Sequence, residues 1–183
     1  MMDVRNRRRL QLLLVAALFA APAVVGMALV LTGWMPGTKS YGLPILPQRN
    51  VSGVPVHARD GKPFAWRDRA FRWTLVALPG PDCERRCLQA LDLIHRVRIT
   101  LNQNADKLRL LYLGAPPAGD DAGGVLRAWT VAPSSAHAFD DLRPNRRDAV
   151  AAVLVMPDGV ALTHYPAGFD PEGLKKDLHK VIQ

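Results

Sequence analysis

Two continuous apolar runs with an amphipathic segment between them place the strongest constraint on the fold of this chain. The runs FRWTLVAL (Phe71–Leu78) and LRLLYL (Leu108–Leu113) have the length and composition of buried central strands. Between them, apolar residues recur at three- and four-residue steps and predict a helix with one buried stripe, formed by Leu88, Leu91, Ile94, Val97 and Leu101. Strands joined through a helix in this way are expected to pair in parallel, as a right-handed β-α-β unit.

The C-terminal part of the sequence predicts a β-hairpin followed by a helix. The apolar segment Ala149–Met156 and the segment VALTHY flank Pro157-Asp158-Gly159, a sequence typical of a tight turn. Asp170 is expected to cap a last helix that begins at Pro171. The buried face of this helix is expected to consist of Leu174, Leu178 and Val181. A β-α-β unit, a hairpin and a terminal helix form the layout of a thioredoxin-like α/β domain, whose chemistry lies where the first core strand runs into the first helix.

Two other segments have weaker patterns. VPVHARDGKPFAW, which begins at Val54, looks like two short strands around an Asp60-Gly61 turn. Between Gly114 and Arg147 we expect a loop in APPAGDDAGG, a short strand in VLRAWTVA and a helix in SSAHAFDDL.

The N-terminus predicts a membrane anchor. Four arginines within the first nine residues precede the segment LQLLLVAALFAAPAVVGMALVLTGW (Leu10–Trp34), and the next charged residue is Lys39. The segment is longer than the ~20 residues that a transmembrane helix needs, and much longer than the apolar region of about 7–15 residues in a cleavable signal peptide. We therefore expect a single, uncleaved transmembrane helix at residues 10–34, with residues 1–9 in the cytoplasm.

The expected anchor also sets the compartment and the domain boundaries. In a bacterium it makes the chain a single-pass inner-membrane protein whose remaining residues lie in the periplasm, an oxidising environment. Residues 35–53 are rich in Pro and Gly and are expected to form a linker, although their second half fits an edge segment against the domain nearly as well. The thioredoxin-like domain is then expected at residues 54–183.

Composition and motifs exclude several classes of function. Hydrophobic residues make up 49% of the chain, which is enough for a core that needs no disulfide to hold it. The net charge of +8 comes with basic residues dispersed among acids beyond the N-terminus, so nucleic acid is not an expected partner. The sequence has no Gly-rich phosphate loop, no G-x-S-x-G and no H-E-x-x-H, so hydrolase and nucleotide-binding functions have no support.

The only two cysteines, Cys83 and Cys87, stand in the loop between the first core strand and the helix. Their spacing of four residues fits a redox pair, a clip for one soft metal ion and a structural disulfide. A disulfide across so short a loop adds little entropic stabilisation, which favours a functional pair. If the cysteines open the helix, its free N–H groups favour their thiolates, and Arg85 and Arg86 add positive charge.

Two thiolates one helical turn apart suit Cu(I), which prefers sulfur ligands. A third ligand would complete such a site, and His137 is the candidate because its irregular segment is able to fold back over the cysteines. The remaining histidines are interpreted as structural or exposed: His57, His95, His164 and His179.

Taken together, the N-terminal anchor, the C-x-x-x-C loop after the first core strand and the ending VLVMPDGVALTHYPAGFDPEGLKKDLHKVI resemble the Sco/SenC proteins. The resemblance covers about Gly53 to Gln183 and extends to small membrane-anchored proteobacterial members of this group. It implies a membrane-tethered, copper-binding or thiol-active factor for the assembly of cytochrome c oxidase, with Cys83 and Cys87 as its site residues.

The sequence departs from the Sco pattern at two places. Sco proteins have Cys-Pro-Asp-x-Cys, whereas here Pro81-Asp82 precede Cys83. The histidine that binds copper in Sco proteins lies about nine residues before the proline of the P-D-G turn, and counting back from Pro157 leads to Asp148. Either His137 takes the place of that ligand or the third ligand is absent, which would favour thiol chemistry or transient copper transfer.

The leading hypothesis is an assembly factor that hands Cu(I) to subunit II of cytochrome c oxidase or keeps the cysteines of its CuA site reduced. In the second role Cys83 attacks the partner disulfide and Cys87 resolves the mixed disulfide. One alternative is a non-catalytic thioredoxin-like scaffold that binds other assembly factors. Another is a general periplasmic thiol-disulfide oxidoreductase, which the lack of a C-x-x-C motif disfavours.

Overall fold

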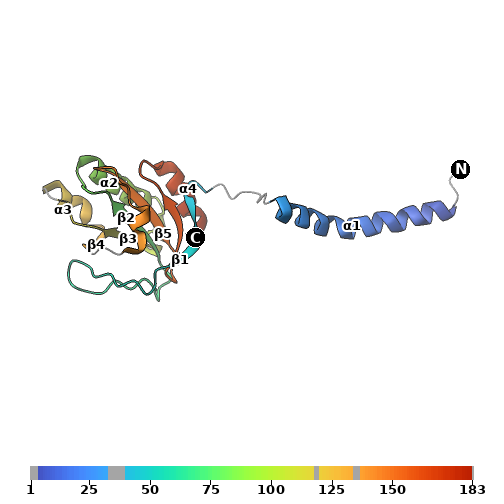
Figure 1. The fold of residues 1–183 in the computed structure, drawn as a ribbon, viewed down its shortest axis with the longest axis horizontal. Helices are drawn as coiled ribbons and strands as arrows, with labels where there is room; N and C mark the ends of the chain where they lie inside the picture. The colour runs from blue at the N-terminus through green and yellow to red at the C-terminus, as the bar shows by residue number, and fades with distance from the viewer. Residues whose placement is uncertain (1–3, 33–39, 118–119, 134–136, 183) are drawn as a thin grey trace. The chain divides into compact units, whose positions relative to one another are not determined.

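The computed structural model of the protein describes residues 4–32, 40–117, 120–133 and 137–182. It divides the chain into two compact units, Met1–Lys39 and Ser40–Gln183. The described part of the first unit is one helix, α1 (Val4–Thr32), with Pro22 inside it. Figure 1 shows this helix in blue.

The structure of the first unit does not establish that residues 10–34 form the expected transmembrane helix. Within the part of the chain that the structure describes, no helix is both long enough and apolar enough to cross a membrane. Gly33 and Trp34, at the end of the expected span, lie outside the described residues. The anchor and the periplasmic location therefore remain predictions.

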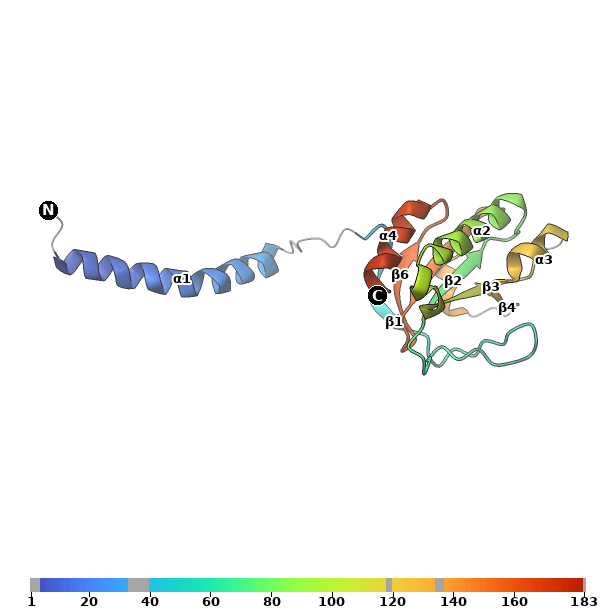
Figure 2. The same ribbon diagram turned by 180° about the vertical axis from the view of Figure 1, so that it is seen from behind.

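The second unit is built on one mixed sheet with the strand order β1-β6-β5-β2-β3-β4, whose strands are labelled between Figures 1 and 2. Strands β2 and β3 are parallel and are joined through α2, as the apolar runs predict, and β4 continues the parallel half. Strands β5, β6 and β1 form the antiparallel half. The elements are β1 (Leu43–Asn50), β2 (Trp73–Pro79), α2 (Arg85–Ile99), η1 (Asn102–Lys107), β3 (Leu108–Leu113), α3 (Asp120–Leu126), β4 (Thr130–Ala132), η2 (His137–Leu142), β5 (Val150–Val155), β6 (Val160–Tyr165) and α4 (Pro171–Val181).

The central strands are buried on both faces, which explains their unbroken apolar runs. Leu75 and Ala77 of β2 pack with Cys87 and Leu91 of α2 and with apolar residues of α4. Figure 2 shows α2 and α4 together on this side of the sheet. The intervening residues of β2, Val76 and Leu78, belong to a second core cluster on the opposite face.

The second face is covered by a long connection, residues 51–72, which we call the cover loop, and by η2. The cover loop contributes Val51, Val56 and Trp66 to the second core cluster, and η2 contributes Phe139. Two strands were expected in this region around Asp60-Gly61, but the described backbone forms only one isolated bridge, between His57 and Pro63. The turn itself is present, with Gly61 at a φ of 80°.

In the second half of residues 35–53 the structure has the edge segment that the sequence left open beside the linker. Leu43–Asn50 form the edge strand β1, paired antiparallel with β6, so the domain begins near Ser40 and not at residue 54. The carboxylate of Asp177, 5% exposed, accepts hydrogen bonds from the Tyr41 and Gly42 amides at 2.7 and 3.1 Å. Pro44 and Pro47 hide the strand in the sequence, because prolines are tolerated in strands mainly at edges.

Two shorter elements also differ from expectation. The segment APPAGDDAGG was expected to be a loop, but its second half begins helix α3 (Asp120–Leu126). Its two glycines lower the helix propensity, so sequence alone favoured a loop. The helix expected in SSAHAFDDL is the short 3-10 helix η2, while Ser134 and Ser135, its expected caps, lie outside the described residues.

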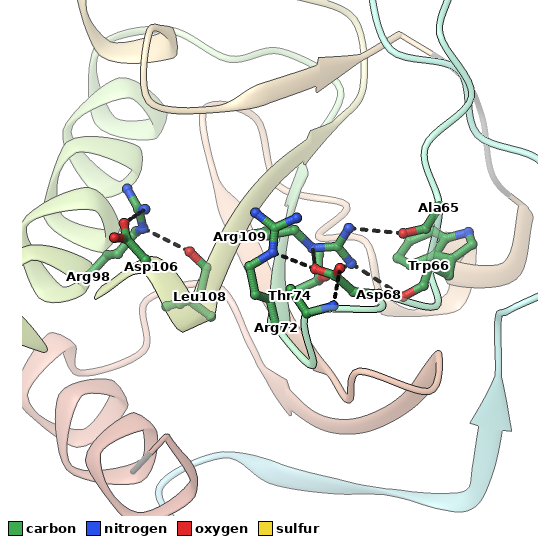
Figure 3. A network of polar contacts seen from close by, with 10 residues as sticks. Ala65, Trp66, Asp68, Arg72, Thr74, Arg98, Asp106, Leu108 and Arg109 are labelled. Atoms are coloured by element: carbon green, nitrogen blue, oxygen red, sulfur yellow. Dashed lines mark hydrogen bonds and ion pairs between the residues drawn. The ribbon is translucent and has the colours of Figure 1, made fainter. Parts of the chain in front are cut away.

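A polar network fixes the cover loop to the parallel strands, and Arg109 of β3 lies at its centre (Figure 3). The Arg109 guanidinium donates to the carbonyl oxygens of Ala65 at 2.9 Å and Trp66 at 3.3 Å, and to Thr74 Oγ1 at 2.7 Å. It also pairs with Asp68, whose side chain is 9% exposed, at 3.5 Å. These contacts satisfy loop carbonyl groups that no strand partner reaches.

Arg109→Ala should lower the free energy of unfolding by about 1–3 kcal/mol, because two loop carbonyl groups lose their donor and Asp68 keeps Arg72 as its remaining ion-pair partner. Urea unfolding of the residue 40–183 unit, followed by tryptophan fluorescence, measures the change. Arg69→Ala is the matched control, since Arg69 is exposed in the same loop. Equal stability of the two variants would contradict this role of Arg109.

Candidate functional site: the cysteine loop

The two cysteines form a disulfide at the start of α2. Cys83 lies just before the helix and Cys87 in its first turn, with a Cα–Cα separation of 5.1 Å. The loop follows directly on the carboxyl end of β2, as expected for the reactive loop of a thioredoxin-like domain. The spacing left a redox pair, a metal clip and a staple open, and the structure brings the two sulfur atoms into a covalent bond.

The two cysteines differ in their exposure. Cys87 is fully buried and packs in the core cluster with Leu91 and Ile94, while Cys83 is only partly buried at the edge of that cluster. An incoming thiol or disulfide can therefore approach Cys83 and not Cys87. The roles expected from the sequence, with Cys83 attacking and Cys87 resolving, require this difference and remain predictions.

The N-terminus of α2 is capped by a residue from a distant part of the chain, Asp148. Its carboxylate accepts hydrogen bonds from the backbone amides of Glu84 at 2.8 Å, Arg86 at 3.0 Å and Cys87 at 2.9 Å. The local N-cap residue, Glu84, makes no side-chain capping hydrogen bond. Asp148 thus takes up amides that would otherwise be free to stabilise a thiolate.

The ionisation of Asp148 follows from the same contacts. Its partial burial tends to raise the pKa of the carboxyl group, but the three amide hydrogen bonds outweigh this effect and hold the pKa below its ordinary value. Asp148 is therefore a carboxylate at neutral pH, and it places a negative charge beside the disulfide.

The backbone of Asp148 has a φ of 49°, a conformation that asparagine and aspartate tolerate better than most residues.

The segment that carries Asp148 is held against the cysteine loop by two further contacts. The Gly80 amide donates to the Ala149 carbonyl at 2.8 Å, and a side chain on Gly80 would overlap the carbonyl oxygen of Arg146. Arg147 forms an ion pair with Asp82, next to Cys83. The position of Asp148 is therefore fixed from both sides.

The third copper ligand suggested by the sequence is not part of this site. The side chain of His137 is 87% exposed and its Nδ1 lies 2.8 Å from Asp140 Oδ2, on η2. Phe139 of the same short helix packs on the sheet face opposite Cys87. Among the residues described, no three His, Cys, Asp or Glu side chains form a group that could hold a metal ion. The donor set Cys83, Cys87 and His137 does not fit a preassembled copper site.

Sequence reasoning found the position of Asp148 but missed its role. Counting back from the P-D-G turn leads to Asp148 at the distance where the Sco pattern has its copper-ligand histidine. The contact between this aspartate and the amides of residues 84–87 depends on the pairing of β5 with β2, which brings Val150 opposite Pro79. The signal available in the sequence was an aspartate, Asp148, directly before a central strand and at the distance from the P-D-G turn where the Sco pattern has a histidine.

The mixed sheet, with a disulfide between its first parallel strand and the following helix, defines a thioredoxin-like protein. A family model described as "Transmembrane-like, thioredoxin-like, C-terminal domain" matches residues 73–183, and the chain belongs to this family. A comparison with curated proteins finds no match.

Solved structures confirm the resemblance in fold to Sco proteins. Yeast Sco1 with copper bound has a TM-score of 0.54 at 15% identity, over 80% of this chain and 94% of that chain. Apo Sco1 from Thermus thermophilus has a TM-score of 0.50 at 13% identity, over 80% and 96%. A protein assigned as the thiol:disulfide interchange protein DsbE from Chlorobium tepidum has a TM-score of 0.51 at 11% identity, over 70% and 92%.

Asp148→Asn should make the disulfide easier to reduce. The substitution removes the negative charge while keeping an acceptor for the amides, so the helix N-terminus stabilises a Cys83 thiolate more strongly. A gain of roughly 0.5–2 kcal/mol corresponds to a reduction potential about 10–40 mV less negative. Equilibration in glutathione or dithiothreitol buffers, with thiol alkylation and mass spectrometry, measures the potential.

Asp82→Asn is the control, because Asp82 pairs with Arg147 and accepts no hydrogen bond from the described backbone amides of α2. An unchanged or more negative potential for Asp148→Asn would contradict the electrostatic role.

Proposed function

We propose that the protein is a thiol-disulfide exchange factor that reduces cysteine pairs of proteins during assembly of cytochrome c oxidase. The observation that carries this proposal is the unequal exposure of the two bonded cysteines at the start of α2. Cys83 is partly exposed, whereas Cys87 is buried. A structural staple would not need one accessible sulfur, and it would add little stability across so short a loop.

The exchange runs through two displacements. The Cys83 thiolate attacks one sulfur of the substrate disulfide, forms a mixed disulfide and releases the first substrate thiolate. Cys87 then attacks Cys83, which forms the Cys83–Cys87 disulfide and releases the second substrate thiolate. Two electrons pass from the cysteine pair to the substrate, and a dithiol donor must restore the reduced pair. The disulfide in the structure corresponds to the product of one such turnover.

The substrate class rests on the resemblance of the cysteine loop and of the C-terminal hairpin and helix to Sco proteins. In that role the substrates are the CuA-site cysteines of subunit II, which must be reduced before copper binds. The replacement of the Sco ligand histidine by Asp148 favours reduction of the partner over storage of the metal, since Asp148 is engaged by three amides.

The proposal includes an N-terminal membrane anchor that holds the domain in the periplasm. Its support is the uncharged segment from Leu10 to Thr38 behind a cluster of arginines. The full chain should resist extraction from bacterial membranes by alkaline carbonate and be open to external protease in spheroplasts, whereas a chain that begins at Ser40 should be extracted.

The active cysteine can be identified by trapping. The reduced Cys87→Ser variant should accumulate a mixed disulfide with a disulfide-bonded peptide that carries the cysteine pair of subunit II, because the resolving thiol is missing. Cys83→Ser should trap less than about a tenth as much, since Cys87 is buried and the attack rate depends on access. Non-reducing gels and mass spectrometry measure the adduct. No adduct with either variant would support an inert disulfide in a scaffold protein instead.

Transfer of Cu(I) is a second candidate function, favoured by the two sulfurs one helical turn apart and by the copper-bound state of yeast Sco1. Anaerobic competition titration of the reduced domain tests it. We expect binding through Cys83 and Cys87 that is unaffected by His137→Ala and at least about tenfold tighter in Asp148→His, which supplies a third ligand of suitable type. Tight binding by the wild type that is lost in His137→Ala would contradict the site geometry described above.

A further inference from the structure

A groove lies beside the cysteine loop, between the start of α2, the segment before β5 and the segment before α4. Its volume is about 220 Å³, and Arg86, Arg146, Asp148, Leu93 and Phe169 are among the residues that line it. Neither cysteine lines the groove, but Asp148, which does, accepts a hydrogen bond from the backbone amide of Cys87, so the groove lies next to the cysteine loop. The groove is not used by the exchange chemistry described above.

The charge of this groove is positive. Arg86, Arg146 and Arg147 line it and are exposed, and Asp148 is the one acidic residue in its lining. Arg147 is paired with Asp82, and the Asp148 carboxylate is engaged by amides. Among the ion pairs of the described residues, none involves the side chain of Arg86 or Arg146. The charge of Arg86 contributes to the lowered pKa of Asp148, but neither guanidinium group has an acidic hydrogen-bond partner among the described residues, so both can bind a ligand carboxylate.

The wall formed by the helix is apolar. Leu93 of α2 is 43% exposed, and Ala90 lies one turn before it. On the opposite side Phe169 lies over Tyr165, with 6.1 Å between the ring centroids, and Ala167 and Pro171 extend the wall. An exposed leucine and a half-buried phenylalanine on either side of a groove can bury an apolar side chain of a partner.

We propose that this groove docks the polypeptide segment that flanks the substrate disulfide and selects a segment with an acidic and an apolar residue near its cysteine. The acidic residue pairs with Arg86 and Arg146, and the apolar residue packs between Leu93 and Phe169. This inference rests on the proposed exchange function and adds the substrate preference of the same site. A polypeptide occupant is chosen because a chain that continues from the attacked cysteine can extend from Cys83 past Asp148 into the groove.

Stopped-flow exchange with two disulfide peptides tests the inference. The peptides are identical except that two residues beside the cysteine are Asp and Leu in one and Lys and Ser in the other. The reduced residue 40–183 domain should react roughly tenfold faster with the acidic peptide, and this preference should shrink with added salt. In Arg86→Glu/Arg146→Glu the preference should vanish or reverse. Arg69→Glu, an exposed charge reversal in the cover loop, should keep it.

A small uncharged substrate, 2-hydroxyethyl disulfide, distinguishes a failure of the proposed exchange function from a failure of the docking inference. If the domain reacts neither with it nor with the peptides, the exchange function itself fails. If it reacts with all substrates but shows no preference for the acidic peptide, the docking inference alone is overturned. A double variant that slows all three substrates by the same factor would also overturn it, because the arginines would then act on the cysteine pair and not on the partner.

Discussion

The Asp148 carboxylate, which accepts hydrogen bonds from three amides at the N-terminus of α2, is the interaction on which the account of this site depends. It joins the segment before β5 to the cysteine loop. It also occupies backbone amides at the start of α2 that, without such an acceptor, could stabilise a thiolate. By its distance from the P-D-G turn, this position resembles that of the copper-ligand histidine in the Sco pattern. An aspartate here offers no imidazole ligand, and its negative charge is expected to make the dithiol state of the neighbouring cysteines less favourable relative to the disulfide. Both properties fit the proposed reduction of a partner better than storage of a metal ion.

The rest of the fold brings this contact about. Strand β2 pairs with β3 on one side and with β5 on the other, and both faces of these strands are buried. The carboxyl end of β2 and the amino end of β5 therefore meet at one edge of the sheet, where Gly80 and Ala149 share a hydrogen bond. Burial of Cys87, in the first turn of α2, against the sheet leaves Cys83 as the more accessible sulfur. The packing that stabilises the domain thus also fixes which cysteine a partner can reach.

Elements with regular periodicity could be predicted from the sequence. The β-α-β unit, the hairpin around Gly159 and helix α4 with its Asp170 cap follow from local patterns, and the structure confirms them. The edge segment at β1 was only an alternative to a linker, because its prolines weaken the strand pattern and its place is set by Asp177, more than a hundred residues away. Helix α3 was missed because Gly123 and Gly124 oppose a helix locally. The cysteines were found from their position, but their pairing and the contact with Asp148 depend on tertiary distances that no local pattern encodes.

The most direct test of the central claim is the equilibrium reduction potential of the Cys83–Cys87 disulfide in the wild-type residue 40–183 domain. The account predicts a value between about −300 and −200 mV, the range in which a cysteine pair can donate electrons and be reduced again by a dithiol partner. A value well below about −300 mV, typical of structural disulfides, would contradict it and identify the pair as an inert bridge.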